Sequence, residues 1–333
     1  MDFVIIWVDG NDPKWQLEKS KYSGQATSKA QSDGKSRYRD WELLRYWFRG
    51  VEQFAPWIDK VHFVTCGHFP EWLNLNHPQL NFVKHSDYIP QKYLPTFNSH
   101  TIELNLHRIK NLSEEFVYFN DDMFLVGKTK PSDFFQHGLP CEEALMQFLV
   151  FKKFSMAKSI DNYNTAFINK NFKKHSCFKK NLFKYFNAKY GLKSNLYSLY
   201  TFFHPLFTGF KHTHTAQSFL KSTFEKVWAK EYDFLDQTCQ SKFRGYENVN
   251  QYIFHHWQIA EGNFVPCSFK KTRARYDLDI IDSKTISTQI LKKEKQIICL
   301  NDEENLIEPY EIMKNNFIQM FETLLPIKSN FEI

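Results

Sequence analysis

The chain opens with a short apolar run that predicts a buried strand. Residues Phe3–Val8 are β-branched or aromatic and show no polar alternation, which is typical of a strand covered on both faces of a sheet. The run ends in the turn sequence Asp9-Gly10-Asn11-Asp12-Pro13. Similar apolar runs predict further strands at 61–65, 80–84, 116–119 and 296–300.

Helical spacing of apolar positions alternates with these strands. Leu43, Leu44, Trp47, Val51 and Phe54 recur at intervals of three and four, so a helix is predicted from about residue 40 to Pro56. The same reasoning predicts helices at 99–112, 216–234, 249–259 and 309–325.

The order of these elements predicts the fold class. Strands that alternate with helices favour an α/β fold, Rossmann-like, with a mostly parallel sheet flanked by helices. We expect residues 1–130 and 211–333 to form one α/β catalytic domain, with 131–210 as a helical, basic and aromatic-rich insertion or lobe. Ligands of such sheets bind at the carboxyl ends of the strands.

Positive charge is concentrated in that middle segment. The formal net charge is +6, yet residues 151–200 alone contain eleven Lys against one acidic residue, Asp161. Interleaved Phe and Lys, as in 171–186, suit peripheral contact with an anionic membrane, an anionic polymer, or a solvated helical face above buried Phe. No recognised nucleic-acid-binding motif accompanies the charge, so nucleic acid is not an expected partner.

The cysteines and the amino terminus bear on location. The six cysteines are scattered without a Cys-x-x-Cys pair, and the first apolar run lacks a basic segment before it or a small-residue cleavage site after it. Reduced thiols in the cytoplasm are therefore expected, either free or peripheral at the inner face of the cell membrane through the basic lobe.

Two predicted strands end in an Asn-Asp turn. Asn120-Asp121-Asp122 follows the strand at 116–119, and Asn301-Asp302-Glu303 follows the strand at 296–300. Carboxylate and amide oxygens suit Mg²⁺ or Mn²⁺ held against a diphosphate. Asn and Asp are also ordinary turn residues, but the occurrence of two such turns after apolar strands favours a site.

A few other polar residues are candidates for chemistry. His212 and His214 precede a predicted helix, and an imidazole can accept a proton or hydrogen-bond a phosphoryl oxygen. Arg244 is a natural bidentate clamp for phosphate. Glu103 and His107, four residues apart, suit either a catalytic dyad or a surface pair. These groups would suffice for phosphoryl transfer, which needs positioning, cationic clamps and one base.

Four stretches of the chain, taken in order, carry a resemblance to a known family. They are 2–13 (DFVIIWVDGNDP), 37–124 (with RYRD, LPTFNS and YFNDDMF), 214–257 (with Phe243-Arg244) and 299–332 (beginning CLNDE). They resemble the signature regions of the Stealth polysaccharide phosphotransferases, a family that also includes the lysosomal-enzyme N-acetylglucosamine-1-phosphotransferase.

Two departures from the family pattern stand out. Cys66-Gly67-His68 stands where Gly-Gln is usual, and His214-Thr-Ala216 stands where His-x-Pro is usual. His212 is therefore an alternative match for the family histidine, although the distance to Arg244 favours His214.

The resemblance implies both a fold and a reaction. It implies a glycosyltransferase-A-like sheet and transfer of hexose-1-phosphate or N-acetylhexosamine-1-phosphate from a nucleotide sugar. The acceptor is a hydroxyl of a capsular or surface polysaccharide, and the products are a phosphodiester and a nucleoside monophosphate. Two other classes stay open on the residues alone: a conventional metal-dependent glycosyltransferase that releases nucleoside diphosphate, and a non-catalytic polysaccharide-binding or assembly protein.

The resemblance also implies roles for particular residues. Asp2, His214 and Arg244 are the implied catalytic residues, with Asp2 expected to orient His214 or to bind metal. Mg²⁺ or Mn²⁺ is implied at Asn120, Asp121 and Asp122. The implied donor-binding residues are Trp7, Asp9, Gly10, Arg39, Asn98, Ser99, His107, Arg108, Asn301 and Asp302.

Overall fold

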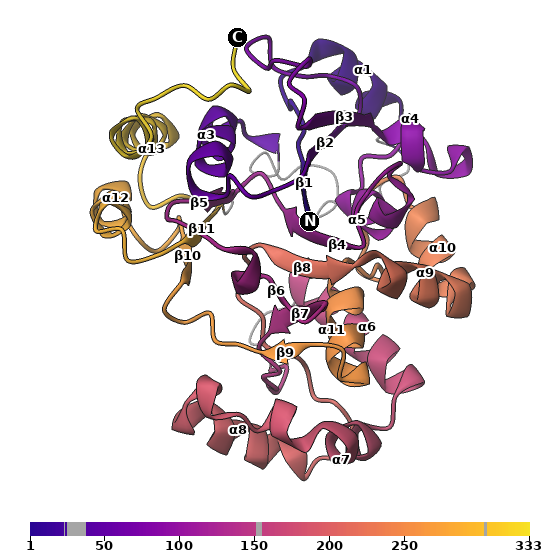
Figure 1. Cartoon of the computed structure of the whole chain (residues 1–333). Coiled ribbons are helices and arrows are strands. Elements are labelled where there is room, and N and C mark those ends of the chain that lie inside the picture. Colours follow the sequence, from indigo (N-terminus) through magenta and orange to yellow (C-terminus); the bar gives the residue numbers. More distant parts are fainter. Residues whose placement is uncertain (23, 25–37, 151–154, 303–304) are drawn as a thin grey trace.

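A five-stranded sheet lies at the centre of the computed structural model, which describes residues 1–22, 24, 38–150, 155–302 and 305–333 (Figure 1). The strand order is β3-β2-β1-β4-β8. Four strands are parallel and β8 runs antiparallel beside β4. The bounds are β1 (Asp2–Ile6), β2 (Val61–Thr65), β3 (Leu80–Lys84), β4 (Glu115–Phe119) and β8 (Gln217–Leu220).

Alternate side chains of β1 enter two apolar cores on opposite faces of this sheet. Phe3 and Ile5 pack with α3 (Leu44–Phe54) and α13 (Tyr310–Leu324). Val4 packs in a second core with α9 (Lys221–Lys230) and α11 (Tyr252–Glu261). Burial on both faces explains why β1 shows no polar alternation, and it confirms the predicted α/β class with a mostly parallel sheet.

Two smaller sheets extend the structure. In the first, β11 (Ile297–Asn301) is parallel to β10 (Arg273–Asp277) and antiparallel to β5 (Met123–Leu125). Because β5 follows β4 after a single turn, this sheet brings the end of β11 close to the end of β4. The second small sheet contains β6 (Phe135–Gln136), β7 (Leu139–Glu142) and β9 (Val265–Pro266).

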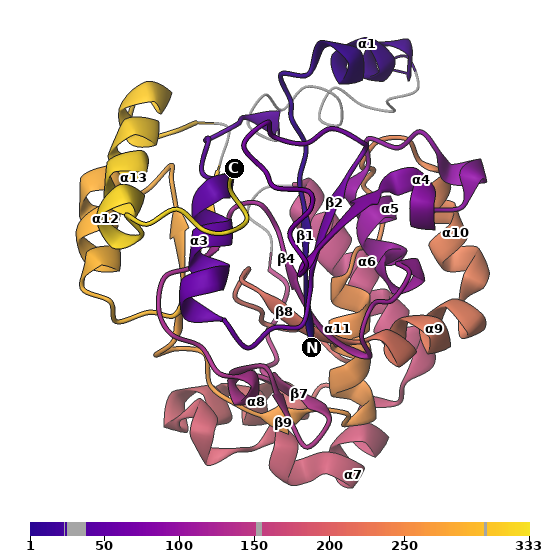
Figure 2. The same cartoon turned by 45° about the horizontal axis from the view of Figure 1, so that its top comes forward.

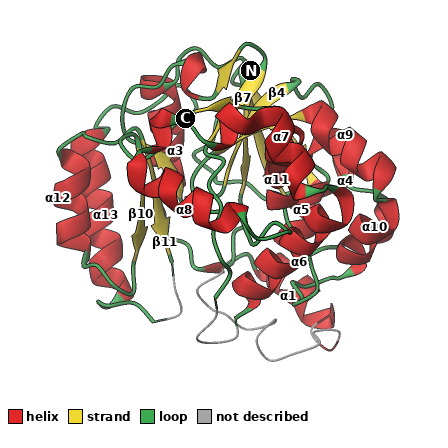
Figure 3. Cartoon of the chain, turned by 90° about the horizontal axis from the view of Figure 1, so that it is seen from below, coloured by secondary structure: helices red, strands yellow, loops and turns green. Residues whose placement is uncertain are grey.

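The remaining helices surround the sheets. Figure 2 shows α1 beyond the carboxyl ends of the parallel strands and α7 and α8 at the opposite end of the molecule, where Figure 3 shows them from below. The bounds are α1 (Pro13–Tyr22), α4 (His85–Tyr88), α5 (Ser99–Leu104), α6 (Met156–Asn171), α7 (Lys174–Tyr185), α8 (Leu192–Phe202), α10 (Tyr232–Gln240) and α12 (Ser283–Leu291), with 3₁₀ turns at Gln91–Tyr93, Leu106–Arg108, Pro131–Asp133 and Ala188–Tyr190.

The basic segment 131–210 packs onto the main sheet. Phe167 of α6 and Phe178 of α7 belong to the same buried core as Val4 of β1. The segment therefore shares the core of the sheet, while α8 lies at its margin. Lys152 and Lys153, two of its basic residues, fall outside the described part of the chain.

Two predicted helices differ from the structure. The helix expected at 99–112 ends at Leu104, because Asn105 leaves helical geometry and its Nδ2 donates to the Thr101 carbonyl at 2.8 Å. The helix expected at 216–234 begins as strand β8, a segment of four residues that pairs with β4 before α9 starts. Residues 217–220 are too few for the spacing of their apolar side chains to distinguish a strand from a helix, and pairing with β4 decides that they form a strand.

Candidate active site

A cleft of about 330 Å³ opens where β1, β4 and β11 end. Trp7 follows β1, the turn 120–122 follows β4, and Asn301 and Asp302 close β11, and all of them line the cleft. The two Asn-Asp turns, far apart in the sequence, therefore meet at one site. Glu303 and Glu304 of the second turn lie outside the described residues.

Strand register brings His214 to the turn after β4. Antiparallel β8 pairs Gln217 with Tyr118, so the residues just before β8 pass beside those just after β4. His214 Nε2 lies 3.5 Å from Asp122 Oδ2, and its Nδ1 shares a hydrogen bond of 3.2 Å with the Tyr252 hydroxyl. The ring is therefore oriented by two side chains at the cleft.

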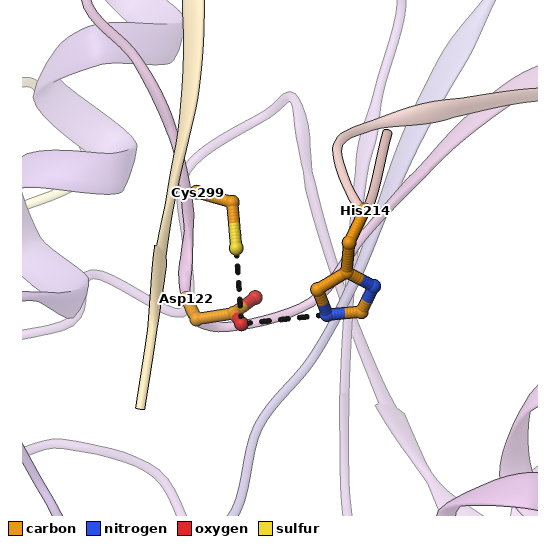
Figure 4. Close-up of side chains that lie close together, drawn as sticks. All are labelled: Asp122, His214 and Cys299. Carbon is orange, nitrogen blue, oxygen red and sulfur yellow. Dashed lines mark hydrogen bonds and ion pairs between the residues drawn. The ribbon is translucent and has the colours of Figure 1, made fainter. Parts of the chain in front are cut away.

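Strand register also brings the Cys299 thiol to Asp122. Antiparallel pairing places Cys299 of β11 opposite Met123, and the Leu300 N–H donates to the Asp122 carbonyl at 2.9 Å. The Cys299 thiol donates to Asp122 Oδ2 at 3.3 Å, and Figure 4 shows Asp122 between Cys299 and His214.

His212, the alternative family histidine, points elsewhere. Its ring stacks on Tyr252 at 3.8 Å and its Nε2 lies 3.5 Å from Asp161 Oδ1. It lines a separate small cavity, and burial lowers its pKa. Of the two histidines, the structure places His214 in the cleft.

The acidic turn has the donors that a hard divalent cation needs. Asp121 is exposed to the cleft, yet desolvation by the surrounding protein and the charge of neighbouring Asp122 raise its pKa to about 7. Asp122 Oδ1 is buried and has no hydrogen-bond partner among the described residues. Adjacent carboxylates with an unpartnered oxygen fit Mg²⁺ or Mn²⁺, whose charge would relieve their repulsion. Asn120 Oδ1 accepts from the Tyr118 hydroxyl at 2.5 Å, which holds the turn.

Arg244 enters the cleft from the loop between α10 and α11. Its Nε and Nη2 both donate to Ser99 Oγ, at 3.0 and 2.5 Å. Asn98 lies behind this contact: it caps α5 by accepting from the His100 N–H at 3.1 Å, and it donates to Asn248 Oδ1 at 3.1 Å. Ser99 lines the cleft as expected, whereas Asn98 holds the Arg244 loop against α5 from outside it.

Glu103 is a cleft residue that the implied site did not include. It is 4% exposed, lines the cleft, and accepts from the Tyr118 hydroxyl at 3.3 Å. Burial raises its pKa to about 7, although Arg244 opposes the shift. The sequence did contain a signal that could have identified Glu103 as a site residue. Glu103 lies four residues after Ser99, and residues four apart share a helical face. The suggested dyad with His107 is not formed, since the helix ends between them and His107 packs against Phe224 and Trp228.

We expect Glu103→Gln to change how stability depends on pH. The pKa of a glutamate in an unfolded chain is about 4.3, so between about pH 4.3 and 7 folded Glu103 keeps a proton that the unfolded chain releases. Its contribution is complete below pH 4.3 and is lost as the pH rises through 7. Denaturant unfolding between pH 4.5 and 8 should show a shallower decline in the variant, whose unfolding free energy at pH 8 gains as much as about 4 kcal/mol over wild type. Glu225→Gln, at an exposed position, is the control, and parallel pH curves for wild type and Glu103→Gln would contradict the burial argument.

Asp2 does not meet the other implied catalytic residues. It lies at the amino end of β1, roughly 13 Å along the strand from Ile6 at ~3.3 Å per residue. Its carboxylate accepts from His62 Nε2 at 3.0 Å and from the Ser113 N–H at 2.8 Å. Burial raises its pKa, but these hydrogen bonds outweigh it and the net shift is downward. A role in orienting His214 or holding metal at the cleft does not fit this geometry, because a strand separates its two ends.

Other implied donor-binding residues do not line the cleft. Arg108 donates to Asn105 Oδ1 at 3.0 Å and stacks over Trp228, away from the cleft. Asp9 Oδ1 accepts from the Asn11 N–H, and its own N–H donates to His68 Nε2. A Cβ at Gly10 would lie 2.1 Å from the Tyr38 carbonyl, so glycine there allows the Tyr38 backbone to approach closely.

One wall of the cleft is held by Asp302. Its Oδ1 accepts from Arg39 Nη1 at 2.8 Å and its Oδ2 from Trp41 Nε1 at 2.9 Å. Both oxygens are therefore engaged in positioning Arg39 and Trp41. Together with Trp7, the Trp41 ring gives the cleft aromatic faces suited to a base or a sugar ring.

Comparison with known proteins identifies the family. The profile of Stealth protein conserved region 1 matches residues 1–27, and that of conserved region 2 matches residues 37–142. The full chain is 41% identical to the capsular polysaccharide phosphotransferase WcwK of Streptococcus pneumoniae and covers 98% of it. The chain belongs to the Stealth family.

Other relatives are similar to this chain over its full length. The full chain is 39% identical to the receptor polysaccharide phosphotransferase WefC of Streptococcus oralis, covering 99% of it. It is 34% identical to the exopolysaccharide phosphotransferase cps2G of Lactiplantibacillus plantarum, covering 96%. This Stealth protein is thus an enzyme of the phosphotransferase class, as expected. The region 2 match includes many of the residues that line the cleft, Ser99, Glu103 and Asp122 among them.

One solved structure aligns with the whole chain at low structural similarity. Galactosyltransferase LgtC, in complex with donor and acceptor sugar analogues, aligns with a TM-score of 0.43 and 9% identity, covering 99% of this chain and 98% of LgtC. We draw no conclusion about activity from a similarity of this degree.

Proposed function

We propose that this Stealth protein transfers a sugar-1-phosphate from a nucleotide sugar to a hydroxyl of a surface polysaccharide and releases a nucleoside monophosphate. The observation that carries the proposal is the convergence of acidic, imidazole and guanidinium groups in one cleft lined by aromatic rings. The full-length similarity to proteins named as capsular and exopolysaccharide phosphotransferases supports the substrate class.

In the proposed reaction the acceptor hydroxyl attacks the phosphorus that carries the sugar. With Nδ1–H donating to the Tyr252 oxygen, His214 Nε2 bears a lone pair and takes the hydroxyl proton. A bond forms between the acceptor oxygen and this phosphorus. The bond from phosphorus to the bridging oxygen breaks, and its electron pair leaves with the nucleoside monophosphate.

Two features of the cleft would neutralise the negative charge of the diphosphate: the Arg244 guanidinium and a divalent cation held by the acidic turn. Arg244, held by Ser99 and beside buried Glu103, binds phosphoryl oxygens as charge develops on the leaving group. Asp121 and Asp122, with Asn120, would hold Mg²⁺ or Mn²⁺, which would supply further neutralisation of the diphosphate. Trp7 and Trp41 offer stacking surfaces for the donor.

The leaving nucleotide tests this proposal directly. Purified protein with Mg²⁺ or Mn²⁺, a panel of nucleotide sugars and an oligosaccharide acceptor should release nucleoside monophosphate in step with acceptor extension. Release of nucleoside diphosphate would instead show attack at the anomeric carbon, that is, a conventional glycosyltransferase. No release with any donor, together with acceptor binding, would favour a non-catalytic polysaccharide-binding role.

We also propose that the surface of α7 and α8 binds an anionic membrane. Among the described residues no helix has the length and apolarity to cross a bilayer, so contact would be peripheral. Residues 162–224 contain no Asp or Glu, and an apolar face with a basic rim suits an anionic headgroup region. The exposed residues of this α7–α8 surface are Leu182, Phe183, Leu192, Leu196, Tyr197, Leu199, Tyr200, Phe203 and Leu206, with Lys173, Lys179, Lys180, Lys189 and Lys193 around them.

Vesicle binding should depend on this surface and on lipid charge. Phosphatidylglycerol-containing vesicles should sediment the protein at low salt, and pure phosphatidylcholine vesicles should not. Leu192→Ser/Phe203→Ser should weaken binding at least 10-fold, whereas Ile327→Ser/Ile333→Ser should not, although these pairs are similarly exposed (78% and 75% against 78% and 74%). Equal effects of both pairs, or a concentration-dependent dimer that the first pair abolishes, would contradict membrane binding.

A further inference from the structure

We infer that Asp122, His214 and Cys299 form an open, thiolate-containing site for a thiophilic divalent cation such as Zn²⁺, and that its occupation blocks transfer. The inference that occupation blocks transfer rests on the proposed function; the inference that the site binds metal does not. The three side chains offer one oxygen, one nitrogen and one sulfur, all within 4.8 Å of one another (Figure 4).

The spacing of the donor atoms matches a tetrahedral zinc site. With Zn–S of about 2.3 Å and Zn–N and Zn–O of about 2.1 Å, tetrahedral angles separate sulfur from oxygen by about 3.6 Å and nitrogen from oxygen by about 3.4 Å. Here Cys299 Sγ lies 3.3 Å from Asp122 Oδ2, and His214 Nε2 lies 3.5 Å from the same oxygen. These two separations lie within a few tenths of an ångström of the tetrahedral values, and all three donor atoms lie within 4.8 Å of one another, so a small movement of the partly exposed His214 ring would complete three corners of the tetrahedron.

The surroundings hold these donors in place. Cys299 is fully buried in β11, and the Leu300 N–H bond to the Asp122 carbonyl couples the two ligands through the backbone. Tyr252 engages His214 Nδ1, which leaves Nε2 directed at Asp122; such outer contacts are typical of metal-binding histidines. Asp122 and His214 are partly open to the cleft, with side chains 24% and 22% exposed, so the fourth corner is available to water or a donor oxygen.

The donor atoms distinguish Zn²⁺ binding at Asp122, His214 and Cys299 from Mg²⁺ binding at the acidic turn. Mg²⁺ prefers oxygen donors alone, whereas Zn²⁺ and Co²⁺ accept thiolate and imidazole. On binding, the Cys299 S–H bond breaks, its proton passes to solvent, and a sulfur–metal bond forms. The His214 Nε2 lone pair is then occupied by metal and cannot accept the proton of an acceptor hydroxyl, which is why occupation blocks transfer.

Cobalt absorption tests the site without reference to activity. Two other thiols near potential ligands are removed first by Cys66→Ser/Cys267→Ser, because Cys66 lies 3.5 Å from His68 Nδ1 and Cys267 contacts Cys141. Titration of this background with Co²⁺ should give one equivalent of a near-ultraviolet thiolate-to-cobalt band with visible bands of tetrahedral cobalt. Adding Cys299→Ser should abolish the thiolate band, and adding His214→Ala should weaken Co²⁺ binding at least 10-fold. Adding Cys239→Ser, at a buried thiol outside the cleft, should leave the band unchanged. A band that survives Cys299→Ser, or none in the background, would overturn the site.

A second measurement tests the block. In the Cys66→Ser/Cys267→Ser background, Zn²⁺ should inhibit Mg²⁺-supported transfer reversibly, with recovery on chelation and re-addition of Mg²⁺. Adding Cys299→Ser should raise the Zn²⁺ concentration for half-inhibition at least 10-fold, relative to its own uninhibited rate. A cobalt band with transfer that resists Zn²⁺ would overturn the block and keep the site. If no donor supports transfer, the proposed function fails while the cobalt result still stands or falls by itself.

Discussion

Replacing His214 with alanine is expected to lower kcat for sugar-phosphate transfer by about 10²–10⁴-fold, the usual contribution of a positioned general base. The expectation follows from the ring's position in the cleft, where Tyr252 engages Nδ1 and Nε2 faces Asp122. Single-turnover rates with saturating donor and acceptor would measure the loss. Because the side chain is only partly buried, the thermal midpoint should change little.

His212→Ala is the informative control for this prediction. His212 stacks on the same Tyr252 ring but lies toward Asp161, outside the cleft, so its removal should cost far less activity. A large loss in His212→Ala with near-normal rates in His214→Ala would reverse the assignment of the family histidine. Near-normal rates in both variants would remove imidazole catalysis from the proposed mechanism.

The buried strands of the parallel part of the sheet could be predicted from the sequence because their cause is local, whereas antiparallel β8 was expected to be helical. The run Phe3–Val8 had no polar alternation, and β1 is indeed buried on both faces. Each Asn-Asp turn could be recognised as a candidate site by itself, but their convergence could not be predicted, because β11 lies in a different sheet from β4 and reaches it through β5. In the structure both turns line one cleft, with Asp122 and Asp302 on its walls.

What the sequence could not supply was the pairing of distant segments. Cys299 reaches Asp122 only because β11 pairs with β5 in one register, and a shift by one residue would turn its side chain to the other face. Glu103 was considered only as a partner of His107, since nothing local predicted that the helix would end at Leu104. Asp2 is a different case: the resemblance implied a catalytic role, and the structure places Asp2 at the amino end of β1, where it contacts His62 and not the cleft.

Several implied donor-binding residues act one layer behind the cleft. Asn98 joins the start of α5 to the Arg244 loop, and Gly10 gives room to the Tyr38 backbone beside Arg39. Motif residues can therefore be required for the shape of a site without touching a ligand. Replacing such a residue would lower activity by displacing the neighbours that line the cleft. Sequence comparison by itself does not distinguish this effect from the loss of a direct contact with the ligand.

Arg244→Lys is expected to lower kcat by about 10²–10³-fold, close to the effect of Arg244→Ala, even though the charge is kept. Arg244 uses Nε and Nη2 together on Ser99, which leaves its Nη1 edge for the phosphoryl group in a fixed plane. A lysine ammonium has no such fork and cannot hold both contacts at once. If the clamp acts on charge that develops in the transition state, KM for the donor should change little while kcat falls.

Arg108→Lys is the matched control, because that arginine was also implied in donor binding but stacks on Trp228 away from the cleft. Steady-state kinetics of the two lysine variants, with thermal unfolding as a check on the fold, would compare them directly. Loss in Arg244→Lys with near-normal turnover in Arg108→Lys is the expected result, since only the first reaches the cleft. Equal rates for Arg244→Lys and wild type would mean that charge alone suffices at this position, and the role of the fixed guanidinium plane would have to be abandoned.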